Sequence, residues 1–324
     1  MPDPRPASPS LGKLVAAFAA VYVLWGSTYL GIRFSIETLP PFFTQGVRFL
    51  LAGVVIYAWA LAAGAARPSR REWGGAAVTG FLLFVCGTGG VVWAERFIPS
   101  GVAALVVATE PMSFVLIEAM RRRRMPKGAV LAGIALGCAG LAILAGPGAL
   151  GSGRFDAAAM GVLVVGTFCW AGGSLFSRGS RLPSSPVMAT AVTLLCGGAL
   201  LALAGLSAGE LARFDPAAVS AKSVLATVYL FVFGSIVGFS AYLWLLRVTT
   251  ASRVSTYAYV NPIVAVFLGW ALAGEALTPR VLLASVVIVG AVAVVIRYGG
   301  EDEETVGPQE ADLGCERPSE TLHA

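Results

Sequence analysis

The stretch WAERFIPSGVAALVVATEP, residues 93–111, returns in altered form as WLLRVTTASRVSTYAYVNP, residues 244–262. At a constant shift, three positions keep their residue type: Trp93 and Trp244, Arg96 and Arg247, and Pro111 and Pro262. A second pair of segments, WGSTYLGIR at 25–33 and WAGGSLFSR at 170–178, has matching tryptophan and arginine positions. Because the paired motifs follow one another in the same order, the sequence predicts two copies of one structural repeat.

The composition of the chain predicts that these repeats lie in a membrane. The 324 residues are 57% hydrophobic and only 13% charged, whereas soluble globular proteins carry about 25% charged residues. Apolar segments of roughly bilayer-spanning length alternate with polar, Pro- or Gly-containing breaks. Ten such segments cover approximately 13–32, 42–63, 74–94, 101–120, 128–146, 159–177, 186–207, 223–245, 254–273 and 280–297. Backbone in lipid must satisfy its own hydrogen bonds, and barrel strands would be shorter and half polar, so we expect ten transmembrane helices.

Five helices per copy determine how the copies are related. Because five is odd, the second copy enters the membrane upside down, which gives two inverted five-helix repeats. With a cytoplasmic N-terminus, sixteen Lys and Arg residues fall on the cytoplasmic side and six on the other, so both termini are predicted to be cytoplasmic. The expected segments are a cytoplasmic N-terminal segment (1–12), the first repeat (13–146), an extracytoplasmic linker (147–158), the second repeat (159–298) and a disordered acidic cytoplasmic tail (299–324).

Several classes of protein do not fit this sequence. The single histidine, His323, lies in the tail, which removes His-based zinc sites and Ser-His triads from the membrane body. No phosphate-binding GxxxxGK[ST] motif is present, and the five cysteines form no C-x-x-C pair. The basic run RRRRMPK at 121–127 flanks a predicted span, where it indicates topology rather than nucleic-acid binding. We therefore expect no enzyme, cofactor, metal site or nucleic-acid partner.

Glu110 stands directly before Pro111 near the middle of a predicted span. An acid at that depth costs about 2.5–3.5 kcal/mol, and raising a Glu pKa from about 4.3 to 7 costs about as much, so the carboxyl is poised between two states. It could couple proton movement, or it could be a static hydrogen bond between helices. Pro111 removes a helical hydrogen bond, and the repeat places Asn261 and Pro262 opposite it. Both prolines are therefore predicted to break their helices beside a cavity near the membrane midplane.

Other polar or aromatic residues at membrane depth are candidates for the same cavity. Arg48 could snorkel to the surface, pair with Glu110 or hold a substrate carboxylate. Indole and phenol groups at that depth need a polar partner, which a cavity or a neighbouring backbone could supply. The predicted substrate-binding set is Trp25, Tyr29, Arg48, Glu110, Trp170, Tyr257 and Asn261, with Pro111 and Pro262 as the helix breaks.

Several motifs together resemble the EamA family of the drug/metabolite transporter superfamily. They are LWGSTYLGIR, PPFFTQGVRFLLAG, IPSGVAALVVATEP, TYAYVNPIVAVFLGW and GEALT, and the resemblance extends over residues 13–298. It implies ten helices, two EamA repeats, cytoplasmic termini and transport of small metabolites, often by efflux. The second half carries GEALT after its fourth predicted helix, where the first half carries RRRRMP. Glu275 therefore has no counterpart in the first repeat.

The sequence and the resemblance together predict a secondary transporter of the inner membrane. We expect export of small metabolites such as amino acids, by alternating access around a midplane cavity between the repeats. The expected partners are a small-molecule substrate, the lipid bilayer and, through Glu110, protons; the protein would be a monomer or a homodimer. A channel or receptor-like membrane protein is the alternative reading, and a membrane enzyme fits least well.

Overall fold

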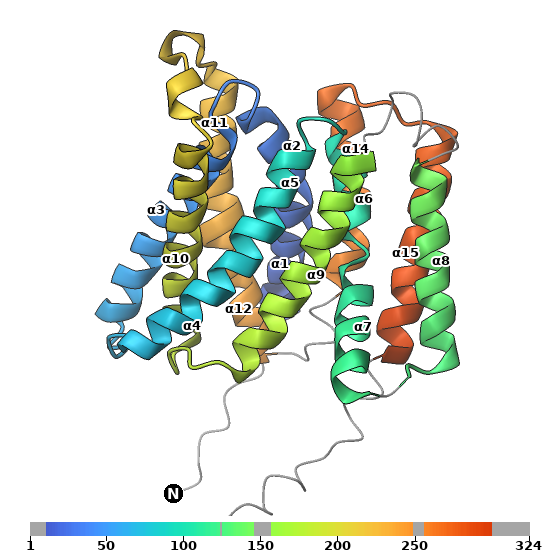
Figure 1. Cartoon of the computed structure of the whole chain (residues 1–324), viewed down its shortest axis with the longest axis horizontal. Helices are drawn as coiled ribbons and strands as arrows, with labels where there is room; N and C mark the ends of the chain where they lie inside the picture. Colours follow the sequence, from blue (N-terminus) through green and yellow to red (C-terminus); the bar gives the residue numbers. More distant parts are fainter. Residues whose placement is uncertain (1–10, 124, 146–156, 249–255, 300–324) are drawn as a thin grey trace, which may run out of the picture.

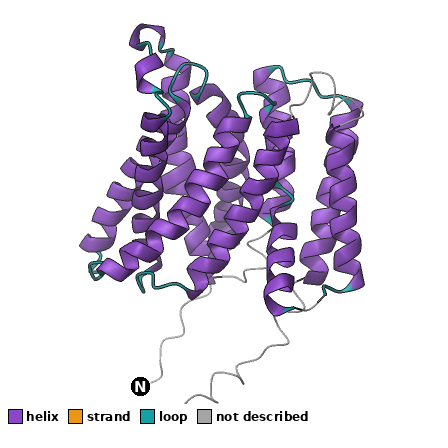
Figure 2. Cartoon of the chain, in the orientation of Figure 1, coloured by secondary structure: helices purple, strands orange, loops and turns teal. Residues whose placement is uncertain are grey.

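The computed structural model of the chain describes residues 11–123, 125–145, 157–248 and 256–299. The predicted N-terminal segment, the linker at 147–158 and the acidic tail fall wholly or mostly outside these residues. Within the described residues the chain is helical and contains no strand, as Figure 2 shows. The expectation of an all-helical membrane protein is confirmed.

Nine helical runs in the described residues are long and apolar enough to cross a membrane. They extend over Leu11–Ser35, Pro41–Ala62, Arg70–Ala94, Ser100–Arg122, Gly128–Ala145, Ala157–Gly179, Pro186–Ser207, Ala221–Tyr242 and Pro279–Tyr298. A shorter apolar helix, Tyr257–Ala273, lies where the ninth of the ten spans was expected. Whether it makes a tenth crossing stays a prediction.

The individual elements subdivide these runs. In chain order they are α1 Leu11–Ala20, η1 Val21–Trp25, α2 Gly26–Ser35, α3 Pro41–Ala62, α4 Arg70–Gly80, η2 Phe81–Thr88, α5 Gly89–Ala94, α6 Ser100–Val107, α7 Glu110–Arg122, α8 Gly128–Ala145, α9 Ala157–Gly179, α10 Pro186–Ser207, η3 Leu211–Arg213, η4 Pro216–Ala218, α11 Ala221–Tyr229, η5 Leu230–Val237, α12 Gly238–Val248, α14 Tyr257–Ala273 and α15 Pro279–Gly299. Proline begins α3, α10 and α15, where a missing backbone donor costs nothing.

Helices of the two sequence halves pack against each other rather than forming two separate bodies. In Figure 1, α3 and α10 lie on one side and α8 and α15 on the other. The α3–α10 contact is close because of glycine: a Cβ on Gly46 would lie 2.3 Å from the Ala202 nitrogen, and one on Gly198 would lie 2.7 Å from the Leu50 nitrogen. Small residues that let backbones approach are the usual basis of helix association in membranes.

Three runs contain a π-helical segment flanked by α-helix on both sides. These segments are η1 in the first run, η2 in the third and η5 in the run that begins at Ala221. A π turn is wider than an α turn and appears mostly in short pieces, often at functional sites. The run that holds η2 packs against α10 and α9, and η5 packs against α3. The sequence analysis did not predict these segments.

Candidate functional site

A central cavity lies between the outer helix pairs and encloses about 960 Å³, including the part that opens to solvent. It is lined by the middle parts of helices from both sequence halves, and each π-helical segment contributes to its wall. Trp25 belongs to η1, Thr88 to η2 and Ser235 to η5. Largely apolar clefts with a few convergent polar groups are the usual form of a small-molecule site.

All seven residues predicted as a substrate-binding set line this one cavity: Trp25, Tyr29, Arg48, Glu110, Trp170, Tyr257 and Asn261. They come from five different helical runs. Helical spacing explains two of the pairs, since Trp25 and Tyr29, like Tyr257 and Asn261, are four residues apart on one face. The structure therefore brings the predicted residues together, and their role in binding a substrate stays a prediction.

Arg48 is buried, with only 5% of its surface exposed. Its guanidinium lies over the ring of Phe49, 4.2 Å from the centroid. Its Nε atom has no hydrogen-bond partner, and no ion pair joins it to any acid in the part of the chain that the structure describes. Arg48 thus neither snorkels to the surface nor pairs with Glu110; it presents an uncompensated positive charge to the cavity.

Glu110 is the first residue of α7 and is half-buried. The chain leaves α6 after Val107 and turns through Ala108 and Thr109, so the helix break falls just before Pro111. A proline in the first turn of a helix needs no backbone donor, which is why the break precedes it. The carboxyl group stands at the positive end of α7, where the peptide dipoles favour a negative charge. This break agrees with the prediction.

The break predicted at Pro262 is wrong. Pro262 lies inside α14, which begins at Tyr257 and continues to Ala273. Pro262 is the sixth residue of α14, so its missing amide removes the single helical hydrogen bond to the carbonyl four residues back, and the helix continues past it. Asn261 packs against the first span instead: with its amide oriented to satisfy both neighbours, its nitrogen donates to the carbonyls of Tyr257, at 3.2 Å, and Tyr22, at 3.1 Å.

Aromatic rings form two groups on the cavity wall. Trp25 is surrounded by Tyr257 at 5.2 Å, Tyr242 at 5.0 Å and Phe239 at 5.4 Å between ring centroids. Across the cavity, the ring of Phe84 lies between those of Phe49 and Trp170. Aromatic faces carry negative charge density and attract cations. The cavity therefore offers aromatic surface together with one side chain of each sign.

Sequence reasoning missed several lining residues, among them Thr28, Thr88, Thr167 and Ser235. Hydroxyl groups are common in membrane helices, where they bond to a preceding carbonyl, as Thr28 does to Trp25 at 2.6 Å. Their type alone therefore gave no signal. Their positions could have indicated them, since each lies on the same helix face as a tryptophan or next to a glycine in the sequence.

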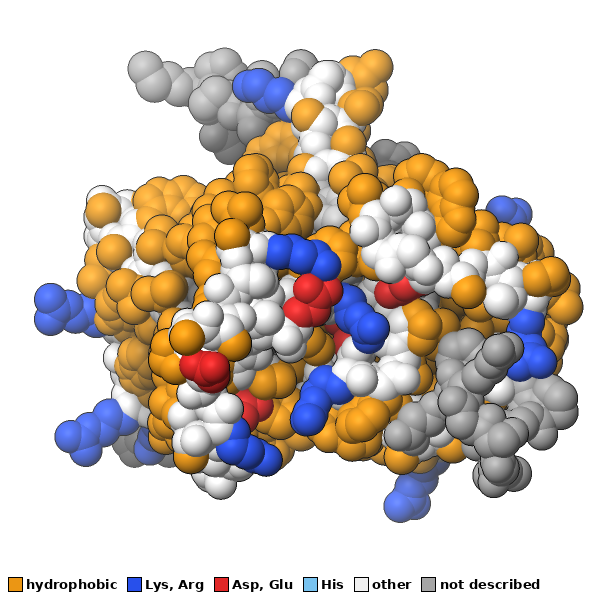
Figure 3. Space-filling view, turned by 90° about the horizontal axis from the view of Figure 1, so that it is seen from above, with side chains coloured by type: hydrophobic (Ala, Val, Ile, Leu, Met, Phe, Trp, Pro, Cys, Tyr) orange, Lys and Arg blue, Asp and Glu red, His pale blue; other side chains and the backbone are white. Residues whose placement is uncertain are grey.

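The upper end of the molecule, as drawn in Figure 1, carries a second group of polar residues. Figure 3 looks onto this end and shows acidic and basic side chains gathered around its middle. Glu275 accepts hydrogen bonds from the Ser100 nitrogen at 2.7 Å and the Gly101 nitrogen at 3.0 Å, and so caps α6. Glu210 caps α3 in the same way, through the nitrogens of Phe42 and Phe43. Both acids come from the second sequence half and hold helices of the first.

A multi-pass helical membrane protein with charged residues around a central cavity has the features of a solute transporter. The EamA-like transporter family matches the chain twice, over residues 12–146 and 157–297, and the chain belongs to this family. The resemblance seen in the sequence is confirmed.

The chain is also similar to curated proteins and to a solved structure. It is 39% identical over 286 residues to the uncharacterized inner membrane transporter YedA of Escherichia coli K12, covering 87% of this chain and 90% of that protein. It is 26% identical over 298 residues to the probable terminal-alkyne amino-acid exporter of Streptantibioticus cattleyicolor, covering 89% and 94%. A crystal structure with 23% identity and a TM-score of 0.60 covers 91% of this chain and 100% of its own, which supports the fold alone. The chain is a multi-pass protein of the inner-membrane transporter type.

Proposed function

We propose that the protein is a secondary transporter that exports small zwitterionic metabolites such as amino acids. The observation that carries this proposal is the pair of charges in the cavity: the buried Arg48 guanidinium, without an ionic partner among the described residues, and the Glu110 carboxyl at the start of α7. A zwitterion brings a carboxylate for the first and an ammonium group for the second. The name of the Streptantibioticus relative is consistent with this substrate class.

Alternating access is the mechanism that this architecture favours. Ten helices in two inverted repeats would place the cavity between the copies, and rocking of one copy against the other would open it to each side in turn. The Lys and Arg distribution favours an extracytoplasmic upper end and cytoplasmic termini. Guanidinium–carboxylate hydrogen bonds would hold one end of the substrate. The aromatic group around Trp25 and the Glu110 carboxyl would hold its ammonium group.

Counterflow in proteoliposomes tests this proposal. Vesicles loaded with a mixture of unlabelled amino acids should accumulate labelled amino acids from outside. The reason is that a carrier exchanges internal substrate for external substrate. Glu110→Gln should lower this exchange strongly. The matched control is Glu118→Gln, on the same helix but ion-paired to Arg122 at 2.5 Å and away from the cavity lining, and it should exchange as the parent does.

A channel or receptor-like protein is the second candidate, and the same assay separates it from a carrier. A channel dissipates the gradient without exchange, and a receptor moves no label at all. Uptake that is equal in the parent, Glu110→Gln and protein-free vesicles, with zwitterions, cations and anions alike, would rule out the carrier proposal.

A further inference from the structure

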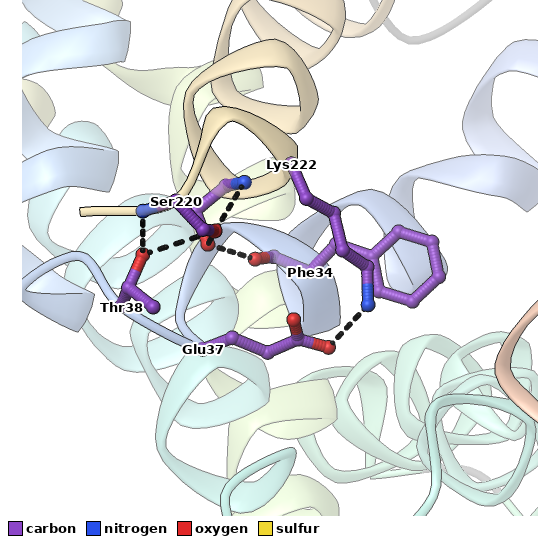
Figure 4. A network of polar contacts seen from close by, with 6 residues as sticks. Phe34, Glu37, Thr38, Ser220 and Lys222 are labelled. Atoms are coloured by element: carbon purple, nitrogen blue, oxygen red, sulfur yellow. Dashed lines mark hydrogen bonds and ion pairs between the residues drawn. The ribbon is translucent and has the colours of Figure 1, made fainter. Parts of the chain in front are cut away.

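Three sets of contacts tie the helices together at the upper end. The first joins α2 to α11 and is shown in Figure 4: Lys222 forms an ion pair with Glu37 at 2.7 Å, and the hydroxyl of Ser223 donates to the Phe34 carbonyl at 2.7 Å. Ser220 adds a backbone hydrogen bond to the Thr38 hydroxyl at 3.1 Å. The end of α2 is therefore fixed to the second sequence half.

The second and third sets lie on the other side of α2. Arg33 donates from Nη1 to the backbone carbonyls of Glu95 and Ile98, and so holds the turn between α5 and α6. Glu275 accepts from Ser100 and Gly101, and so holds the start of α6 to the end of α14. Together the three sets connect α11, α2, α6 and α14 in one continuous series.

The Glu95 side chain is buried beside these contacts and takes no part in them. Its exposed fraction is 0%, and neither carboxyl oxygen has a hydrogen-bond partner among the residues that the structure describes. The charged groups that act on it are Arg33 of α2 and Glu275 after α14. Tyr29, on the cavity wall, also interacts electrostatically with it. The next residue, Arg96, lies over the ring of Phe97 and is exposed.

An ionised Glu95 would be unfavourable in this arrangement. Burying an ionised carboxylate without hydrogen-bond donors is strongly unfavourable, and such a group becomes neutral instead. The nearby amide donors of Ser100 and Gly101 are already bonded to Glu275. Burial therefore raises the pKa of Glu95 well above its usual range, the Glu275 carboxylate raises the pKa further, and Arg33 only partly opposes them.

We propose that Glu95 is a proton-binding site at the extracytoplasmic end, and that its protonation stabilises the contact between α6 and α14 that closes this end. When the O–H bond breaks, the proton passes to water outside and a carboxylate remains beside Glu275. Two adjacent like charges repel each other. Glu275 then weakens its hold on Ser100 and Gly101, and α6 separates from α14. The inference rests on the alternating opening of the proposed function but not on the identity of the substrate.

The sign of the pH effect follows from the two conformations. A closed end binds the proton more tightly than an open end, in which Glu95 meets water and has a pKa of about 4.3. The proton stabilises the closed end fully below the pKa of Glu95 in the open form. This stabilisation is lost as the external pH rises through the higher pKa of Glu95 in the closed form. For one proton the equilibrium shifts by at most about tenfold per pH unit.

The test measures access to the cavity from outside. Ser235 lines the cavity, and its hydroxyl has no hydrogen-bond partner in the described part of the chain, so Ser235→Cys is a near-isosteric probe in a variant whose five native cysteines are replaced. Ala217→Cys, in the exposed turn after α10, serves as the reference for orientation and for thiol chemistry. In intact cells, labelling by a membrane-impermeant thiol reagent at Ser235→Cys, relative to the reference, should rise several-fold from about pH 5 to about pH 8.

Glu95→Gln should abolish this rise, because the amide is always neutral. Labelling at every pH should stay near the level that the parent shows at about pH 5. Glu275→Gln removes the neighbouring charge and should move the midpoint to lower pH. Asp215→Asn, at an exposed acid of the same end that bonds only within its own turn, should leave the profile unchanged. Infrared difference spectra of the purified protein should show a protonated carboxyl band that disappears in Glu95→Gln. A parent profile that is flat, a Glu95→Gln profile equal to the parent's, or an unchanged infrared band would each overturn the inference.

The inference and the proposed function can fail separately. If labelling of Ser235→Cys does not change with pH while counterflow is intact, only the proton-site inference is refuted. If labelling depends on pH and requires Glu95, but the protein shows no counterflow, only the transport proposal is refuted.

Discussion

Replacing Arg48 with methionine should make the protein more stable and less active at the same time. The guanidinium is buried and has no ionic partner among the residues that the structure describes, so the fold bears the cost of an uncompensated charge. Replacing buried ion pairs or triads with apolar residues of similar size is often neutral or stabilising by about 1–4 kcal/mol, and a single buried charge has no ion-pair attraction to offset its desolvation. Loss of the contact with the Phe49 ring lowers the free energy of unfolding by about 0.5–2 kcal/mol. We therefore expect a net gain of about 1 kcal/mol.

The same change should reduce transport. A hydrogen bond to a charged group contributes about 1.5–3 kcal/mol, and Arg48 would supply such a bond to a substrate carboxylate. Since about 1.4 kcal/mol corresponds to a factor of ten, kcat/KM should fall roughly ten- to hundredfold. The assays are thermal unfolding of the purified variant and the initial rate of counterflow. Arg280→Met, an exposed arginine on α15, is the matched control and should change stability by less than about 0.5 kcal/mol.

The opposite pair of results would refute this reasoning. A variant that unfolds at lower temperature and still exchanges substrate at the parent rate would make Arg48 a structural residue. Its stacking on Phe49 would then outweigh the cost of its buried charge.

Three further outcomes can be checked. Glu110→Gln should lower transport at least about tenfold at unchanged expression if the carboxyl binds an ammonium group or a proton, whereas parent-like transport with an unaltered pH profile would leave it only a structural role. Gly198→Ala should destabilise the fold by about 1–3 kcal/mol, because its Cβ would meet the α3 backbone, while Gly161→Ala, with open space around it, should be neutral or slightly stabilising in thermal unfolding. Reporter fusions after residues 125 and 300 should both give cytoplasmic signals, and an extracytoplasmic signal at either would contradict the proposed topology.

The sequence predicted the helical class and the members of the cavity for a single physical reason. A membrane span has few ways to accommodate a charge or a polar ring, so Arg48, Glu110 and Trp170 stood out in apolar surroundings. Residues near the ends of the spans gave no such contrast. Glu95 and Glu275 look like ordinary acids of polar turns, and their burial depends on how the start of α6 packs against α14. That contact joins residues far apart in the chain, which periodicity cannot show.

Local backbone geometry was the other limit. Pro262 carries the same sequence signal as Pro111, yet only the chain before Pro111 leaves the helix. The difference lies in where each helix begins: Pro111 is the second residue of α7, where no helical donor is needed, whereas α14 begins five residues before Pro262 and continues through it. The π-helical segments had no signal at all, since their residues are the apolar types found throughout the spans.

The three π-helical segments give the cavity wall a mechanical property of its own. Where an α turn passes into a π turn, the junction can migrate along the span by one residue as one carbonyl exchanges one amide for the next. Such a step moves the wider part of the helix along the span, while the turns on either side keep their helical hydrogen bonds, as a bilayer requires. Because η1, η2 and η5 each contribute to the cavity lining, a shift of this kind would change the shape of the wall while the α-helical parts on either side stay in place.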